Sequence, residues 1–174
     1  EMCIRDSFRG EVVVVNSFKA LEKIKRKVRG KIVLYNVPFT NYSETVRYRY
    51  DGPNIAAKYG AIASLIRSVG NGSMGTPHTG TMGEYKSFKK IPHAALTAED
   101  AMMINRIYKR GQRVVLNLKM EAKFVEDRWS RNVLAELRGS TYPEEVVVLG
   151  GHIDSWDVGQ GAHDDAGGCV AAWR

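Results

Sequence analysis

Val146 to Gly168 reads VVVLGGHIDSWDVGQGAHDDAGG, and this stretch places a histidine and two groups of carboxylates just after an apolar run. Glu145 to Leu149 has the β-branched, apolar composition of a fully buried strand, and Gly150-Gly151 after it permits a sharp turn. The pattern therefore predicts a strand whose carboxyl end carries polar side chains, which is where open α/β sheets place their ligands.

The spacing of these polar side chains is typical of half a metal site. His152 and Asp154 are two residues apart, so in an extended chain they share a face, and the carboxylate can hold one ring nitrogen of a metal-bound imidazole. Asp164 and Asp165 follow in a glycine-rich loop, where a carboxylate without a partner is costly to bury. One imidazole with hard carboxylate oxygens favours zinc or a similar divalent ion. The alternative interpretation is a solvated acidic loop.

These residues resemble the first metal-binding motifs of the co-catalytic dinuclear zinc exopeptidases, the superfamily that includes bacterial leucyl aminopeptidases and glutamate carboxypeptidases. The similarity continues through other short motifs and spans residues 9 to 174. These motifs are Gly30-Lys31-Ile32-Val33, Asn41-Tyr42-Ser43, Ala63-Ser64-Leu65-Ile66-Arg67-Ser68, Pro77-His78-Thr79-Gly80 and Ser155-Trp156-Asp157-Val158-Gly159-Gln160-Gly161.

The resemblance implies a role for each residue of the motif. His152 would be a ligand of one zinc, Asp164 the carboxylate that bridges two zincs, and Asp154 the residue that orients His152. Asp165 would follow the bridge, and in the family the peptide bond between such residues is commonly cis. His163 departs from the family pattern, and we interpret it as a neighbour of the site, not a ligand.

The resemblance also implies an activity. Family members are zinc metallo-exopeptidases, carboxypeptidases or dipeptidases, which use a metal-activated water and two zincs per active site to hydrolyse dipeptides or small peptides with free termini. Their general-base glutamate, a second histidine and a further acidic ligand for each zinc come from segments after this motif. We therefore expect a fragment that is inactive alone, with its general base beyond Arg174. A secreted or lysosomal protein, and a homodimer when full length, are expected on the same grounds.

Two other classes of protein remain open. One is a catalytically inactive, receptor-like homologue that uses the same two-lobe fold to bind protein. The intact His152, Asp154 and Asp164 argue against it, because a binding protein has no use for an unneutralised acidic pocket. The other is an isolated protease-associated module that only binds partners, which would require the chain to end before the peptidase strands.

Before this motif, strands alternate with short helices, which indicates an α/β unit. The expected strands are residues 11–15, 31–36, 61–68, 91–95 and 113–118, and the expected helices are 17–30, 54–59 and 97–111, the first and last capped by Ser17 and Thr97. By resemblance, residues 9–118 form a protease-associated domain, a small mixed sheet with short helices. A flavodoxin-like domain is the alternative, but the glycine-rich phosphate fingerprint is absent after the first strand, so nucleotide binding is not expected.

The boundaries follow from a change of pattern. From Lys119 the chain has longer extended segments, 119–125 and 132–137, so residues 119–174 are expected to open the α/β sheet of a truncated zinc peptidase domain. Residues 1–8 match nothing in the family and have no strand or helix periodicity, so we treat them as a translated artefact.

Composition excludes two classes of partner. The net charge is +7, but the densest basic stretch, Lys23 to Arg29, alternates with the apolar stripe of an expected helix and has the pattern of its solvated face. No zinc-finger or RNA-binding motif accompanies it, so nucleic acid is not an expected partner. No apolar run approaches the roughly 18 to 20 residues of a membrane span.

Two loops carry further candidate sites. Asn41-Tyr42-Ser43 and Asn71-Gly72-Ser73 are N-glycosylation sequons, so Asn41 and Asn71 are candidate glycosylation sites of a secreted protein. His78 is either an exposed loop histidine or, by resemblance to relatives whose inserted lobe covers the cleft, a residue near the active-site mouth.

Overall fold

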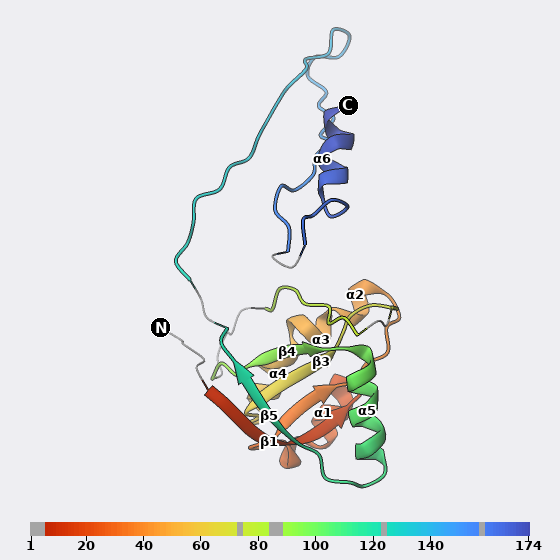
Figure 1. The fold of residues 1–174 in the computed structure, drawn as a ribbon. Helices are drawn as coiled ribbons and strands as arrows, with labels where there is room; N and C mark the ends of the chain where they lie inside the picture. The colour runs from red at the N-terminus through yellow and green to blue at the C-terminus, as the bar shows by residue number, and fades with distance from the viewer. Residues whose placement is uncertain (1–5, 73–74, 84–88, 123–124, 157–158) are drawn as a thin grey trace. The chain divides into compact units, whose positions relative to one another are not determined.

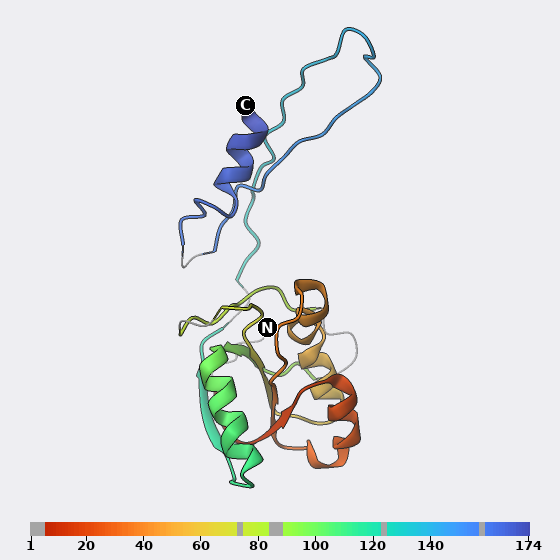
Figure 2. The same ribbon diagram turned by 90° about the vertical axis from the view of Figure 1, so that its right-hand side faces the viewer.

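Five strands form the mixed sheet of the N-terminal part of the chain, with helices on both of its faces (Figures 1 and 2). The structure is a computed structural model, and it describes residues 6–72, 75–83, 89–122, 125–156 and 159–174. It divides into two compact units, Glu1–Glu126 and Asp127–Arg174. The elements in chain order are β1 (Asp6–Val15), α1 (Phe18–Lys23), the 3-10 helix η1 (Lys25–Lys27), β2 (Ile32–Tyr35), α2 (Tyr42–Thr45), α3 (Arg47–Tyr50), α4 (Gly52–Lys58), β3 (Ala63–Arg67), β4 (His93–Leu96), α5 (Ala98–Lys109), β5 (Val115–Met120) and α6 (Ala166–Trp173).

The strand order is β4-β3-β2-β1-β5, and only β5 runs antiparallel to its neighbour. Alternate residues of each strand point to opposite faces, so the sheet separates two apolar clusters. Val13, Val33 and Ile66 pack with α1 and α4 on one face. Ile32 and Leu65 pack with α5 on the other. The α/β fold class predicted from the sequence, a small mixed sheet with short helices, is therefore confirmed.

The helix caps explain where several elements begin. The Ser17 side chain accepts a hydrogen bond from the Ala20 amide, and Thr97 accepts one from Asp100, as the sequence predicted. The first helix is shorter than expected. It ends at Lys23, and a 3-10 turn replaces the rest of the segment before Gly30, which adopts the positive φ expected of a residue that follows a helix.

Residues assigned to an artefact are in part folded. Ser7 and Phe8 belong to β1 and pair with Lys119 and Leu118 of β5, so leaving residues 6–8 out of the fold was wrong. Residues 1–5 lie outside the described part of the chain. The same pairing extends β5 to Met120, beyond the boundary expected at Lys119.

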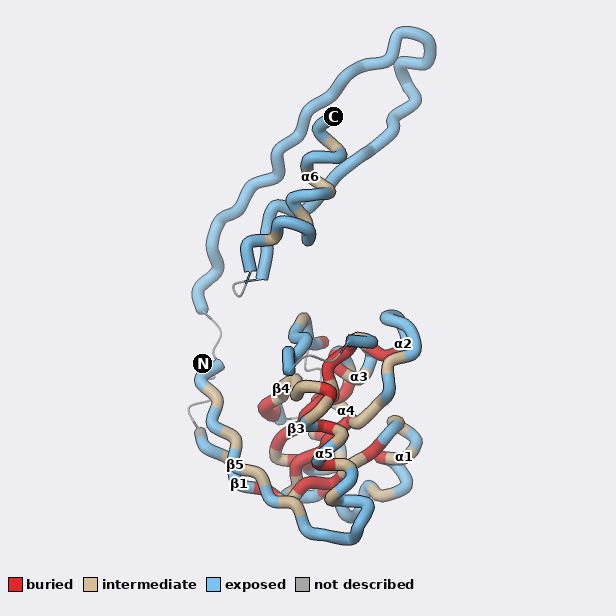
Figure 3. The backbone as a smooth tube through the Cα atoms, turned by 45° about the vertical axis from the view of Figure 1, so that its right-hand side comes forward, coloured by how far each residue is buried: buried red, intermediate tan, exposed pale blue. Residues whose placement is uncertain are grey.

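The second unit differs most from expectation. In its described residues, the expected runs 132–137 and 145–149 form no strand, and Val146 to Leu149 are 72–86% exposed (Figure 3). The physical reason is the lack of a partner, because a strand needs a neighbour to satisfy its backbone groups and none pairs with it there. The unit contains one described helix, α6, which the sequence analysis did not predict. Across the described residues, no helix is both long and apolar enough to cross a bilayer.

Candidate metal centre

The loop before α6 brings His152 together with two of the predicted carboxylates. Its Nε2 lies 2.9 Å from Oδ1 of Asp164, and its Nδ1 lies 2.9 Å from Oδ1 of Asp154. Nδ1 also lies 3.0 Å from the Asp154 carbonyl oxygen. Each ring nitrogen therefore faces a carboxylate oxygen, as a ligand histidine and its orienting residue would be arranged.

This arrangement affects the pKa of the imidazole. Desolvation lowers the pKa of His152, but hydrogen bonds with the Asp154 carbonyl and the two carboxylates outweigh it, so the pKa is raised overall. A neutral imidazole carries one N–H and can donate to one carboxylate only. The other ring nitrogen then faces the lone pairs of a carboxylate oxygen. Only a proton or another cation between these two atoms makes their contact favourable.

Asp165 holds the loop against the helix that follows. Its Oδ1 accepts a hydrogen bond from the Gly168 amide at 3.1 Å, and its Oδ2 accepts one from the His152 amide at 3.1 Å. The Cys169 thiol donates to the His152 carbonyl oxygen at 3.3 Å. The His152 backbone is thereby fixed on both sides, and the Asp164–Asp165 peptide bond is cis.

Two glycines allow this close approach. A Cβ on Gly151 would lie 2.5 Å from the Cys169 backbone nitrogen, and a Cβ on Gly168 would collide with the Asp165 carboxylate. The supporting roles of Asp165, Gly151 and Gly168 were not predicted from the sequence. An aspartate three residues before a glycine at a helix start is a capping signal that could have identified Asp165.

The donor set fits a divalent cation. Asp154 holds Nδ1, which leaves the Nε2 lone pair of His152 directed at Asp164. Two ligand atoms of one tetrahedral zinc are about 3.4 Å apart when each is about 2.1 Å from the metal, so the observed 2.9 Å would have to widen only slightly. Within the described ranges, no group of three or more His, Cys, Asp or Glu side chains is arranged to hold a metal ion. His152 and Asp164 thus offer fewer than the roughly three protein ligands of a catalytic zinc.

The remaining candidate residues do not belong to this hydrogen-bonded cluster. His163 is exposed and has no hydrogen bond or ion pair with any described residue. His78 belongs to the first unit, where its Nδ1 lies 3.3 Å from Arg49 Nη1. Asn41 is exposed and caps α2 through Oδ1, 2.9 Å from the Glu44 amide. Asn71 is also exposed, but the Ser73 of its sequon lies outside the described residues.

Comparison with known proteins gives consistent matches. Residues 132–174 match the model of peptidase family M28. The chain is 52% identical to carboxypeptidase Q of Bos taurus over 169 residues, which are 97% of this chain and 36% of the relative. Identity with carboxypeptidase Q of Homo sapiens is 51% over the same shares of the two proteins.

A solved structure agrees. The crystal structure of a peptidase M28 precursor from Shewanella amazonensis superposes with a TM-score of 0.84 at 32% identity, covering 91% of this chain and 38% of that one. The chain spans about a third of the length of the relatives it matches. The chain is therefore similar to carboxypeptidase Q over nearly all of its residues, and the match to peptidase family M28 covers its C-terminal segment.

Proposed function

We propose that the full-length protein is a zinc-dependent exopeptidase that hydrolyses dipeptides or small peptides with free termini. The observation that carries the proposal is the His152–Asp164 contact, in which Nε2 and Oδ1 face each other at 2.9 Å while Asp154 holds the other ring nitrogen. The similarity to carboxypeptidase Q and to peptidase family M28 supports it. When bound, zinc supplies a Lewis acid and lowers the pKa of a bound water.

The residues of this chain would hold and position that group. His152 would supply a neutral nitrogen and Asp164 a carboxylate shared by two zincs. Asp154 would fix the tautomer and orientation of His152, because a carboxylate at Nδ1 requires the proton on that nitrogen. Asp165 would keep the His152 backbone in place through its bond to the amide, so the ligand atom does not depend on a flexible loop.

Metal content tests the assignment in the full-length protein. His152→Ala and Asp164→Ala should each lose zinc and dipeptide hydrolysis together, because each removes a ligand atom. Asp154→Asn should be milder, weakening zinc affinity by ~10- to 100-fold, because it changes only the orientation of His152. His163→Ala is the matched control and should retain both zincs. Two zincs found by elemental analysis in the Asp164→Ala protein would exclude the bridging role.

We also propose that the protein is secreted or lysosomal and carries a glycan on Asn41. The Asn41 side chain is exposed, and its cap contact uses Oδ1, which leaves the amide nitrogen that accepts a glycan unengaged by that bond.

Ser43→Ala tests the glycan without removing the cap. In protein expressed by mammalian cells, it should reduce by one glycan the mobility shift that a glycosidase produces on a gel. Ser7→Ala, which lies in no sequon, should keep the shift. If Ser43→Ala migrates like the parent chain before glycosidase treatment, Asn41 is not a glycosylation site.

A further inference from the structure

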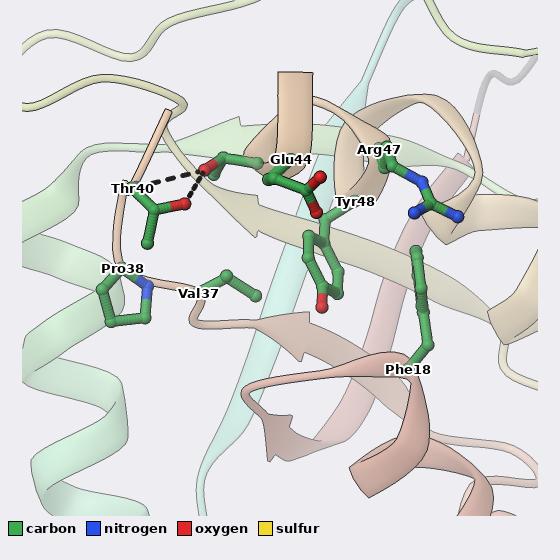
Figure 4. Close-up of a pocket in the computed structure, with 8 residues that line it drawn as sticks. Phe18, Val37, Pro38, Thr40, Glu44, Arg47 and Tyr48 are labelled. Atoms are coloured by element: carbon green, nitrogen blue, oxygen red, sulfur yellow. Dashed lines mark hydrogen bonds between the residues drawn. The ribbon is translucent and has the colours of Figure 1, made fainter. Parts of the chain in front are cut away.

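A pocket of about 260 Å³ opens in the first unit, on the face of the sheet covered by α1 and α4 (Figure 4). It lies where the segment after β2 meets α2 and α3. Its lining residues are Phe18, Val37, Pro38, Thr40, Glu44, Thr45, Arg47 and Tyr48. The pocket lies wholly within one unit and shares no residue with the candidate metal centre.

The floor and one wall of the pocket are preformed. The rings of Phe18 and Tyr48 stack with centroids 4.3 Å apart, and both side chains are half-buried. The Thr45 hydroxyl lies 3.3 Å from the Thr40 amide, which joins the loop after β2 to α2. Stacked rings and a tied loop cost little ordering when a ligand binds, because their conformations are already restricted.

The rim of the pocket carries one acidic and one basic side chain. Figure 4 shows the Glu44 carboxylate and the Arg47 guanidinium on the same side of the pocket, beside the rings of Tyr48 and Phe18. Their side chains form no ion pair or hydrogen bond with each other or with any other described residue. A ligand that carries both a cation and an anion would pair with both of them, and its apolar part would cover the rings.

We propose that this pocket binds a free amino acid with an apolar side chain. Its ammonium would face Glu44, its carboxylate would face Arg47, and its side chain would lie against Phe18 and Tyr48. The proposal is independent of the peptidase activity, because it depends only on residues of the first unit. It assigns to this lobe a small-molecule site that is separate from the metal residues.

The probe is L-phenylalanine, titrated into the 174-residue chain and observed by saturation-transfer NMR. A ligand of this size in a shallow pocket should bind in the millimolar range. N-acetyl-L-phenylalanine lacks the ammonium and L-phenylalanine amide lacks the carboxylate, so each should bind roughly two- to fivefold more weakly, as expected for one exposed ion pair. Equal affinity for the three compounds would mean that the pocket recognises only an aromatic ring, and it would overturn the proposal.

Two variants test which charged side chain of the pocket recognises which charged group of the amino acid. Glu44→Gln should remove the preference for L-phenylalanine over the N-acetyl compound, and Arg47→Met should remove the preference over the amide. Arg106→Met on α5 is the matched control, because it removes an exposed charge on the opposite face of the sheet and should change neither preference. Unchanged preferences in both pocket variants, or the same loss in the control, would contradict the site.

Discussion

His93 shows how a single polar side chain can make the stability of this fold depend on pH. It begins β4, and its Nδ1 lies 2.7 Å from the Ser64 hydroxyl. Its Nε2 is shielded from solvent and has no hydrogen-bond partner among the described residues. Desolvation, aided by the charge of Arg49, lowers the pKa of His93 to about 4, although a hydrogen bond with the Ser64 backbone opposes the shift. The ring is therefore neutral in the folded protein at neutral pH.

The sign of the pH effect follows from that pKa. Between pH 6.5 and about 4 the unfolded chain binds a proton at His93 and the folded chain does not, so stability is present above pH 6.5 and is lost as the pH falls. Urea unfolding should show a decrease from pH 7 to pH 4.5 that is about 2 kcal/mol smaller in His93→Gln than in the parent chain. The exposed His163→Gln should leave the decrease unchanged. The same pH dependence in His93→Gln and in the parent would refute a buried neutral His93.

At the scale of elements, one buried arginine joins α3 to the long loop between β3 and β4. Arg49 is only 7% exposed. Its guanidinium donates to the Thr79 carbonyl oxygen at 3.0 Å, to the Thr81 carbonyl oxygen at 3.4 Å and to the Tyr42 hydroxyl at 3.0 Å. These acceptors are neutral, so the planar geometry of the donors, more than charge pairing, fixes the loop. A Cβ on Gly80 would lie 2.6 Å from Arg49 Nη1, which explains why the loop has a glycine at that point.

Replacing this arginine should release the loop while the sheet stays intact. Arg49→Met removes all of the donors that hold the loop, and Arg49→Lys should not rescue it, because one ammonium cannot reproduce the fork of donors. Hydrogen exchange should become at least about tenfold faster at the Gly83 amide, which bonds to the Tyr50 carbonyl oxygen, given ~0.5 to 1.5 kcal/mol for each of the lost hydrogen bonds. The Val33 amide in β2 should be unaffected. Protection at Gly83 equal to that of the parent would show that the loop is held by other contacts.

Short sequence signals predicted some of these elements and missed others. Thr97 and Ser17 were readable as caps because one residue supplies the hydrogen bond, and the structure confirms both. Helix α2 was missed because Asn41 was interpreted only as a sequon, although an asparagine is also a strong N-cap. The role of Arg49 could not have been identified, since the loop groups that accept from it are backbone carbonyls about thirty residues away and carry no sequence signature.

In the candidate metal centre, too, a contact between residues close in sequence could be predicted from their spacing, and a contact between distant residues could not. The spacing of His152 and Asp154 predicted that they would share a face, and the structure places their side chains in contact. The contact with Asp164 was inferred by resemblance, because a loop of that length has no fixed period. The 145–149 run was predicted as a buried strand from composition, but burial depends on what covers a segment, and the described residues supply no cover.

For the whole molecule, the two units should differ in their resistance to proteolysis. The sheet of the first unit is covered on both faces, whereas nearly every described residue from 127 to 160 is exposed (Figure 3). Proteases cut where the backbone is exposed and lacks stable hydrogen bonds. Limited trypsin treatment of the 174-residue chain should therefore cut first after Arg128, Arg131 or Arg138, all of which are exposed.

The expected product is a resistant core that keeps β1 through β5 and ends soon after Met120, because β5 pairs with β1 up to that residue. Mass spectrometry of the digest would identify its end. An internal comparison comes from Lys109, the last residue of α5, and Arg110, its C-cap, which are exposed but should be cut much later. A stable product that retains Trp156 and Trp173 would mean that the second unit is protected by contacts with the rest of the chain. Its exposed apolar run, Val146 to Leu149, would then have to be covered in solution.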